Sequence, residues 1–372
     1  PVGQQHVTIK LNEGNIRVDK DVQLMKEYFE LEHLSYRDMS PVLVPRNYTK
    51  DFIDGQICLD AQEAAISRAT QVVSDSSDIT LCEGTGHVGV GSIIGLSNAA
   101  VAKMIGADVV LVANGGIGSA FDELEINRVM LKERGVRLLG VVVNKVLPDK
   151  VDMIRDYFGR AIKERWGVPL LGVVPDLPFL AKASLGDIGA LLDAEFAAGQ
   201  RYRELHYGVA DMQCVTTAVR RFLRKTEYRQ SELGARRPLF VTHCTRDDVV
   251  LGFLAHYKRA TMDLEQNATL PAATTASHVG DHWLGAMILC RGAEEITGPH
   301  YTIEDSTALP YLMEITRAYD APIMTTPLGT IEATNAIKNL TPKMHIGDPH
   351  RVAAAIAHYE PHIDFDAMLN NL

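Results

Sequence analysis

The sequence has few aromatic residues, no surplus of positive charge and no long apolar run. Aromatic side chains make up 6% of its 372 residues, so a mainly aliphatic core is expected. The formal net charge of −10 disfavours nonspecific binding to nucleic acid or to an anionic membrane. No apolar run approaches the roughly 18–20 residues that cross a bilayer. We therefore expect a protein that binds neither nucleic acid nor membrane and whose partners are small molecules.

The sequence also lacks paired cysteines. Its five cysteines form no C-x-x-C motif; they are Cys58, Cys82, Cys214, Cys244 and Cys290. The histidines near Asp281 (His278, His282 and His300) show no compact spacing of the kind that holds a metal, and solvated loop positions are expected for them. A disulfide framework or a zinc site is thereby disfavoured. We expect buried, reduced thiols in a cytoplasmic protein.

The order of apolar and amphipathic segments predicts an α/β protein. Buried strands are predicted at 79–83, 108–114, 136–146 and 169–175, and helices at 16–30, 61–74, 92–107, 121–135 and 150–166. Residues 40–55 are predicted to form a loop. Nearly continuous Val, Leu and Ile in strands that alternate with helices is typical of a parallel sheet covered on both faces.

A chain of this length is too long for one average core, so two domains are expected. A polar segment at 231–238 predicts the linker between them. After it, strands are predicted at 238–244, 284–290 and 321–327, and helices at 246–259, 306–319, 329–337 and 349–359. The sequence therefore predicts a first α/β domain over residues 1–230 and a smaller α/β domain over residues 238–372.

A glycine-rich turn follows the strand predicted at 79–83. Residues 84–89 have the G-x-G-x-x-G spacing of a dinucleotide-binding turn. That interpretation needs an acidic residue at the end of the next strand, about 20 residues on. Here the next strand ends in Asn114, and its only acid, Asp108, lies at the opposite end. The pattern therefore favours a different nucleotide fold over an NAD enzyme.

Glu83 stands at the carboxyl end of that predicted strand, immediately before Gly84-Thr85-Gly86. In parallel α/β sheets the carboxyl ends of the strands line the ligand crevice. A carboxylate at that edge suits coordination of Mg²⁺ on nucleotide phosphates. The structural alternative is a cap on the following helix or a solvated strand end.

The segment CEGTGHVG, together with the strands and helices that follow it as far as PLLGVVPDLPFLAKASLGDIGALLDAE, resembles the dethiobiotin synthetase type of P-loop NTPase. The opening PVGQQ resembles the end of that family's second strand, and VDKDVQLM resembles the segment whose aspartate helps to hold Mg²⁺. The resemblance implies a parallel-sheet, P-loop-NTPase-like domain that binds Mg²⁺ and ATP. It implies that Asp21 and Glu83 hold the metal, with Asp19 as the alternative to Asp21.

The same resemblance implies the remaining contacts with the cofactor. The backbone of Gly84, Thr85 and Gly86 would lie near the phosphates. Asn144, at the end of the strand predicted at 136–146, would read the adenine edge, and Lys145 adjoins it. The Asn-Lys pair here lacks an aspartate two residues on, so guanine specificity of the GTPase kind is not indicated.

The sequence departs from this family because it contains no G-x-x-x-x-G-K-[ST] phosphate loop. In the family the loop lies before the strand that PVGQQ resembles, so it would precede Pro1. Two explanations are open. The sequence starts after the loop, or the domain has lost the loop and is a scaffold that does not hydrolyse nucleotide.

The second half of the sequence resembles a DRTGG domain. LFVTHCTRDDVVLGFL resembles its strand, Arg-Asp turn and helix, and LGAMILCRGAEE resembles the strand and turn that usually read Thr-Gly-Gly. Arg246 and Asp247 form a candidate ligand site, since a strand-end arginine binds anions. The acids in that turn have an alternative role as caps of the helix.

The order of these two segments is that of the front part of long bacterial phosphotransacetylases, and the resemblance covers nearly the whole chain. It implies a regulatory module that binds a nucleotide or metabolite, and a homo-oligomer. The alternative is an enzyme, a Mg-ATP-dependent ligase that activates a carboxylate, as in dethiobiotin and cobyrinate amide synthesis.

Overall fold

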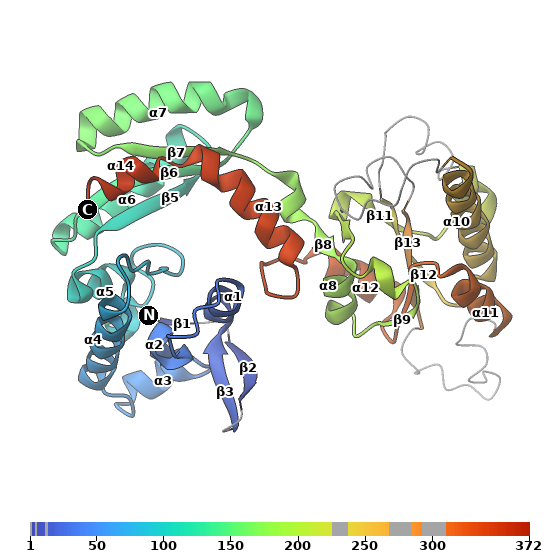
Figure 1. Cartoon of the computed structure of the whole chain (residues 1–372), viewed down its shortest axis with the longest axis horizontal. Helices are drawn as coiled ribbons and strands as arrows, with labels where there is room; N and C mark the ends of the chain where they lie inside the picture. The colour runs from blue at the N-terminus through green and yellow to red at the C-terminus, as the bar shows by residue number, and fades with distance from the viewer. Residues whose placement is uncertain (1, 4–5, 12–13, 225–236, 268–283, 292–309) are drawn as a thin grey trace. The chain divides into compact units, whose positions relative to one another are not determined.

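The computed structural model describes residues 2–3, 6–11, 14–224, 237–267, 284–291 and 310–372 (Figure 1). The chain divides into two compact units. Unit 1 comprises residues 1–177 and 344–372, and unit 2 comprises residues 178–343. The chain therefore begins unit 1, forms the whole of unit 2, and then returns to finish unit 1.

This division differs from the predicted boundaries of 1–230 and 238–372. Residues 178–230 belong with unit 2 because strands from this part pair with strands that follow it in sequence. Residues 344–372 belong with unit 1. Hydrophobic pattern identifies a strand but not the sheet that it joins. Residues 231–236 of the predicted linker lie outside the described residues, as do His278, His282 and His300.

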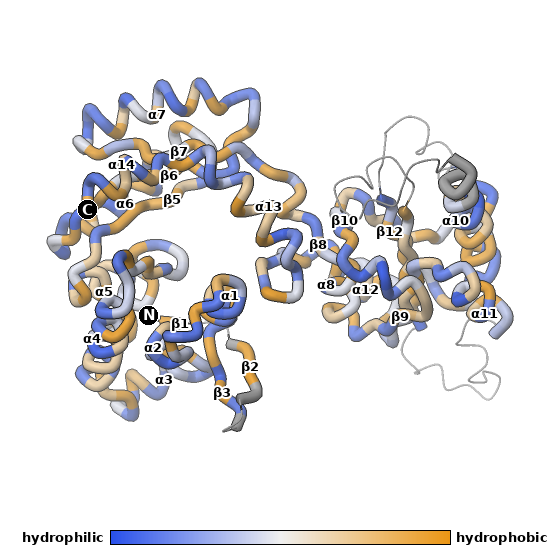
Figure 2. Tube along the Cα trace, in the orientation of Figure 1, coloured by the Kyte–Doolittle hydropathy of each residue, from blue (hydrophilic) through white to orange (hydrophobic). Residues whose placement is uncertain are grey.

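The centre of unit 1 is a parallel sheet in the order β5-β6-β7. Its strands are β5 (Val109–Asn114), β6 (Leu138–Val146) and β7 (Leu170–Pro175). Helices α6 (Gly118–Glu133) and α7 (Val151–Trp166) contribute Leu124 and Phe158 to a buried cluster with Val141 and Val143 of β6. These strands are largely orange in Figure 2, as their apolar sequences require. The predicted α/β fold with a parallel sheet is confirmed.

The last segment of the chain covers the opposite face of the same sheet. It consists of α13 (Pro349–Tyr359), η7 (Glu360–His362) and α14 (Phe365–Leu369). Tyr359 and Ile363 pack against Val142 and Val174, whose side chains point away from α6 and α7. A β-bridge between Gly172 and Ile363 ties the segment to β7. Both faces of β6 are therefore buried, which explains its unbroken apolar sequence.

The N-terminal part of unit 1 contains two small pairs of strands and several helices. The strands are β1 (Val2–Gly3) and β4 (Val42–Leu43), which are parallel, and β2 (His6–Leu11) and β3 (Gly14–Asp19), which form a hairpin. The helices are α1 (Lys20–Tyr28), α2 (Tyr36–Met39), α3 (Tyr48–Ile53), α4 (Leu59–Asp75) and α5 (Asn98–Ile105). The prediction of a helix over residues 16–30 is therefore wrong at residues 16–19, which belong to β3, because Ile16 and Val18 pair with β2. The loop predicted at 40–55 contains β4 and α3.

The strand predicted at 79–83 is absent from the structure: residues 79–85 carry no regular secondary structure. Leu81 is 91% exposed, and Val112 of β5 is 64% exposed. Within the described part of the chain, β5 pairs only with β6, and no strand pairs with residues 79–83. An apolar, β-branched segment becomes a strand only when a neighbour supplies a hydrogen-bonding ladder, so the sequence pattern alone was not sufficient.

Unit 2 contains a five-stranded sheet in the order β11-β12-β13-β14-β9. The strands are β9 (Glu195–Ala198), β11 (Met212–Cys214), β12 (Leu239–His243), β13 (Ala286–Cys290) and β14 (Ile323–Thr326). Only β9, at one edge, is antiparallel to its neighbour. Two short strands, β8 (Ala183–Ser184) and β10 (His206–Tyr207), form a separate pair.

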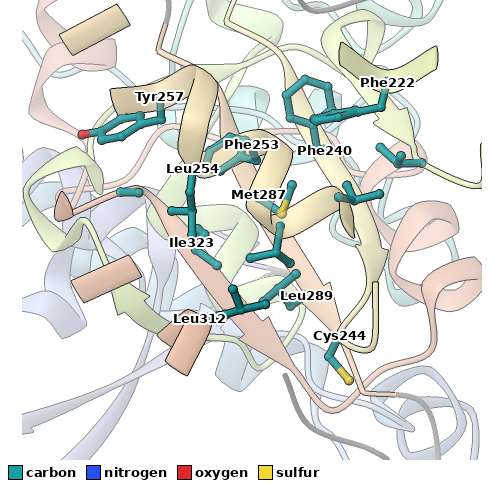
Figure 3. Close-up of a cluster of buried hydrophobic side chains, with 14 residues drawn as sticks. Phe222, Phe240, Cys244, Phe253, Leu254, Tyr257, Met287, Leu289, Leu312 and Ile323 are labelled. Carbon is teal, nitrogen blue, oxygen red and sulfur yellow. The ribbon is translucent and has the colours of Figure 1, made fainter. Parts of the chain in front are cut away.

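Helices cover both faces of the unit 2 sheet. Helices α10 (Asp247–Asn267) and α11 (Pro310–Tyr319) pack on one face, where Phe240, Phe253, Met287 and Ile323 form the core shown in Figure 3. Helices α8 (Leu185–Leu191) and α12 (Thr330–Lys338) pack on the other. The predicted α/β character of the second half is confirmed, although its helices and strands begin sixty residues earlier than the predicted boundary.

None of the five cysteines, all of which are described, forms a disulfide. Cys244 and Cys290 are buried, as predicted, whereas Cys58, Cys82 and Cys214 are exposed, contrary to the prediction. Across the described residues, the helices are too short or too polar to cross a membrane.

Candidate functional site

The carboxylate of Glu83 lies in the electrostatic field of Asp21 and Asp19. The surrounding protein removes water from the Glu83 carboxyl group, which raises its pKa, and the negative charges of Asp21 and Asp19 raise it further. The positive charge of Lys20 acts in the opposite direction. Residues from two separate parts of the sequence therefore act on one another electrostatically, and the assignment of Asp21 and Glu83 as metal ligands stays a prediction.

The two aspartates have different positions at the start of α1: Asp19 caps the helix and Asp21 lies in its first turn. Asp19 ends β3 and is the N-cap of α1: its Oδ1 accepts a hydrogen bond from the backbone N–H of Asp21 at 3.0 Å. A Cβ on Gly3 would lie 2.6 Å from Asp19 Oδ2, so a glycine is needed beside this carboxylate. Because one oxygen of Asp19 is occupied by the cap, Asp21 is the better placed of the two to bind a ligand together with Glu83.

The glycine turn that follows Glu83 is held by two asparagines. Asn98 Nδ2 donates to the carbonyl oxygens of Thr85 and His87, at 3.0 and 2.9 Å. Asn127 of α6 is buried, and its Oδ1 accepts from the backbone N–H of Val88 at 2.9 Å. Gly86 has a φ of +67°, a left-handed conformation that glycine adopts without strain. The turn therefore has a defined shape set by side chains from α5 and α6.

Sequence reasoning did not identify Asn98 or Asn127. The available signal was Asn127 itself, a polar side chain between Leu124 and Leu131 on the apolar face of a predicted helix. The turn also does not lead directly into a helix, since α5 begins only at Asn98. A dinucleotide-binding turn opens a helix at its third glycine, so the structure agrees with the rejection of that interpretation.

Asn144 and Lys145 form a second corner at the carboxyl end of β6. Lys145 is left-handed, with a φ of +55°, and its backbone N–H donates to Asn144 Oδ1 at 2.8 Å. The Tyr359 hydroxyl, at the end of α13, donates to the same oxygen at 3.0 Å. Gly115 fits against this corner, because a Cβ there would lie 2.9 Å from the Lys145 carbonyl oxygen. The side chain of the predicted base-reading residue is thus held by two hydrogen bonds.

The acidic site fits Mg²⁺ when the ion is shared with phosphate. Within the described residues, no three His, Cys, Asp or Glu side chains are arranged to enclose a metal. Mg²⁺ in nucleotide sites is usually held by one or two carboxylates, water and the phosphates themselves. A pair of carboxylates that repel each other, beside a glycine turn, has the donor set that such an ion needs.

In the candidate site of unit 2, the Arg246 side chain is bound to neighbouring protein groups. Both guanidinium nitrogens on one side of Arg246 bind Asp248, at 2.9 and 3.0 Å, and one of them also donates to the Thr217 carbonyl oxygen. Asp247 is the first residue of α10, and its Oδ1 is buried with no hydrogen-bond partner among the described residues. The geometry favours a structural role for Arg246, whose nitrogens are already bonded. Of the two predicted ligands, Asp247 is the one with an oxygen that no described residue bonds.

The sequence of this chain is similar to those of several known proteins. Residues 4–184 match the family described as an AAA domain. The chain is 22% identical to a phosphate acetyltransferase of Nitratidesulfovibrio vulgaris over 93% of this chain and 44% of that protein. It is 24% identical to a phosphate acetyltransferase of Deinococcus radiodurans over 82% of this chain and 39% of that protein.

A third relative matches a smaller share of the chain. The ATP-dependent dethiobiotin synthetase of Saccharopolyspora erythraea is 33% identical over 34% of this chain and 55% of its own length. The chain spans less than half the length of the phosphate acetyltransferases that it matches. Residues 4–184 thus match a P-loop-like AAA domain similar to dethiobiotin synthetase, and most of the chain is homologous to phosphate acetyltransferases.

Proposed function

We propose that unit 1 binds Mg²⁺ together with a nucleoside triphosphate, and that the chain is a regulatory module that responds to this nucleotide. The observation that supports the proposal is the glycine turn held by Asn98 and Asn127, directly after a Glu83 on which the charges of Asp21 and Asp19 act. A divalent cation offsets the repulsion between these carboxylates, and phosphates complete its ligand set. ATP is the first nucleotide to test, because one relative of the chain is named as ATP-dependent.

The proposed site has three groups of residues, which contact the metal, the phosphates and the base. Glu83 and Asp21 hold the metal, and Asp19 fixes the start of α1 through its cap. The backbone of Gly84, Thr85 and Gly86 lies along the phosphates, while Asn144 and Lys145 contact the base. When bound, Mg²⁺ supplies positive charge that neutralises the phosphate oxygens. The protein's own contribution is to orient these groups before the nucleotide arrives.

A regulatory role is favoured over an enzymatic one by the extent of the similarities. The phosphate acetyltransferases match 82–93% of this chain, whereas the dethiobiotin synthetase matches only 34% of it. Unit 2 in this proposal is a DRTGG-like domain, with Asp247 as the residue that contacts its ligand. A cytoplasmic location and a homo-oligomeric state belong to the same proposal, and light scattering after size-exclusion chromatography measures the latter.

The alternative function is a Mg-ATP-dependent ligase that activates a carboxylate. It is favoured by the 33% identity to the dethiobiotin synthetase and by 29% identity to a cobyric acid synthase of Listeria innocua over 39% of this chain. The two functions differ in turnover. A ligase releases phosphate from ATP only when a carboxylate acceptor is added, whereas a sensor binds the nucleotide and releases none.

The test of nucleotide binding compares the unchanged chain with Glu83→Gln by titration calorimetry, with and without Mg²⁺. Loss of one charged ligand is expected to weaken Mg-ATP binding by about 10- to 100-fold, the usual range for a contact to a charged group. Binding without Mg²⁺ should not change. Glu133→Gln, an exposed acid in α6, is the matched control. Equal Mg-ATP affinity in Glu83→Gln and the unchanged chain would remove Glu83 from the metal site.

A further inference from the structure

The oxygen of the Asn144 carboxamide already accepts two hydrogen bonds. The backbone N–H of Lys145 donates to it at 2.8 Å, and the Tyr359 hydroxyl donates to it at 3.0 Å. A backbone N–H can only donate, so the group facing Lys145 must be the oxygen and not the nitrogen. The orientation of the carboxamide is therefore fixed by its neighbours.

This orientation limits what Asn144 can offer to a ligand. An amide oxygen has two lone pairs, and both are occupied by Lys145 and Tyr359. The carboxamide can reach a further group only through Nδ2, which is a donor. Asn144 can therefore donate a hydrogen bond to an acceptor on a ligand. To accept one from an amino group, its oxygen would have to lose the bond from Lys145 or from Tyr359.

Tyr359 is held firmly enough to impose this state. Its ring packs against the buried cluster that contains Val142 and Val174. The adjacent His358 Nε2 makes a hydrogen bond with the Pro175 carbonyl oxygen at 2.8 Å, which fixes the end of α13 to the end of β7. The hydroxyl is thus placed by the C-terminal segment, far in sequence from the strand whose residue it orients.

We propose that Tyr359 is a positioning residue that sets base preference, by making Asn144 a donor and not an acceptor. The preferred bases are then 6-oxopurines, guanine and hypoxanthine, whose N7 and O6 are both acceptors, and not adenine, which the sequence resemblance implies. Adenine presents N7 as an acceptor but an amino group at position 6, which finds no acceptor on Asn144. The inference rests on the proposed binding of a nucleoside triphosphate to unit 1 and names the class of base.

The experiment measures the dissociation constants of Mg-ITP, Mg-GTP and Mg-ATP for the full chain. ITP is the direct comparison with ATP, since the two differ in the group at position 6. We expect ITP to bind about 3- to 10-fold more tightly than ATP, the net value of one neutral hydrogen bond. Tyr359→Phe releases one lone pair of Asn144, and the ratio of ITP to ATP affinity should fall by a similar factor.

Two further variants make the result specific. Asn144→Asp replaces the donor with a second acceptor oxygen and should reverse the preference, so that ATP binds more tightly than ITP. Tyr157→Phe, in α7, removes an exposed hydroxyl from the same unit and should leave the ratio unchanged. A general loss of packing would weaken all nucleotides together and would not alter the ratio.

The outcomes separate the two proposals. Absence of binding by every triphosphate, with and without Mg²⁺, would overturn the proposed function and this inference with it. Tight binding in which ATP equals or exceeds ITP, or a ratio that Tyr359→Phe does not change, would overturn the base preference alone and leave nucleotide binding in place.

Discussion

Glu83 is an exposed residue, but its pKa is raised in the folded protein, which disfavours the charged carboxylate. Burial raises its pKa, and the charges of Asp21 and Asp19 add to the effect. The folded state therefore binds a proton at Glu83 more tightly than the unfolded chain does. Stability from this group is greatest at low pH and is lost as the pH rises from its ordinary pKa of 4.5 through the raised value.

Replacement of Glu83 by glutamine is expected to remove that loss. At pH 7 without Mg²⁺, the free energy of unfolding of Glu83→Gln should equal or exceed that of the unchanged chain, and the difference should vanish towards pH 4. Urea unfolding at several pH values, with hydrogen exchange to follow unit 1, measures this. If Glu83→Gln were destabilised relative to the unchanged chain, and more so at pH 7 than at pH 4, the raised pKa of Glu83 would be contradicted.

The sequence names Glu83 and Asp21 as candidates, but it does not reveal the residues that hold the glycine turn and Asn144. Glu83 and Asp21 were recognisable because each lies in a segment that resembles a known one. Asn98, Asn127 and Tyr359 act through contacts with residues that are distant in sequence, the last across 215 positions. Neither periodicity nor local motif carries information about such contacts, so these residues became visible only in the folded chain.

The helix that carries Tyr359 is anchored at its start by a buried ion pair. Asp348 caps α13 by accepting from the Arg351 backbone N–H, and the two side chains bond at 2.9 Å with each only 1% exposed. Removal of Arg351 takes from the buried Asp348 carboxylate the ion pair that the two residues form. Such a loss typically costs about 3–5 kcal/mol, much more than loss of an exposed pair.

We therefore expect Arg351→Met to lower the free energy of unfolding of unit 1 by about 3–5 kcal/mol. The matched control is Arg160→Met, which breaks the pair of Asp156 and Arg160 on the exposed surface of α7 and should cost under about 1 kcal/mol. Guanidinium unfolding of both variants measures the difference. Equal effects of the two substitutions would show that the buried pair contributes nothing beyond a surface pair.

Most helices and strands were predictable because their apolar patterns reflect local burial. The predicted strands at 108–114, 136–146 and 169–175 correspond to β5, β6 and β7. The prediction was wrong at 79–83, where the pattern is that of a strand but no ladder partner exists among the described residues, and at 16–19, where a strand was taken for part of a helix. In both places pairing, and not local propensity, decided the structure.

The two units differ in continuity: unit 2 is one segment, while unit 1 is made from both ends of the described chain. The predicted boundaries missed this because alternating strands and helices do not reveal which sheet each joins. The C-terminal segment covers one face of β6 and β7, and its contacts include the Asp364 N–H to the Leu171 carbonyl oxygen at 2.7 Å.

Truncation after Lys343 is expected to destabilise unit 1 while leaving unit 2 intact. Loss of the C-terminal segment exposes Val142, Leu171 and Val174, and burial of each such side chain contributes about 1.5–3 kcal/mol. Thermal unfolding should show an early transition with binding of a hydrophobic dye, and hydrogen exchange should show unchanged protection in β12 and β13. Unchanged melting of both units would contradict the division described above.

The return of the chain to unit 1 also determines the order in which the protein is finished during translation. The ribosome delivers every residue of unit 2 before it delivers the residues that close the sheet of unit 1. Of these two units, the one whose residues appear first is therefore completed last, whereas domains usually mature in the order of their synthesis. Until synthesis reaches α13, one apolar face of β6 and β7 stays uncovered, with Val142, Leu171 and Val174 open to water and to other chains.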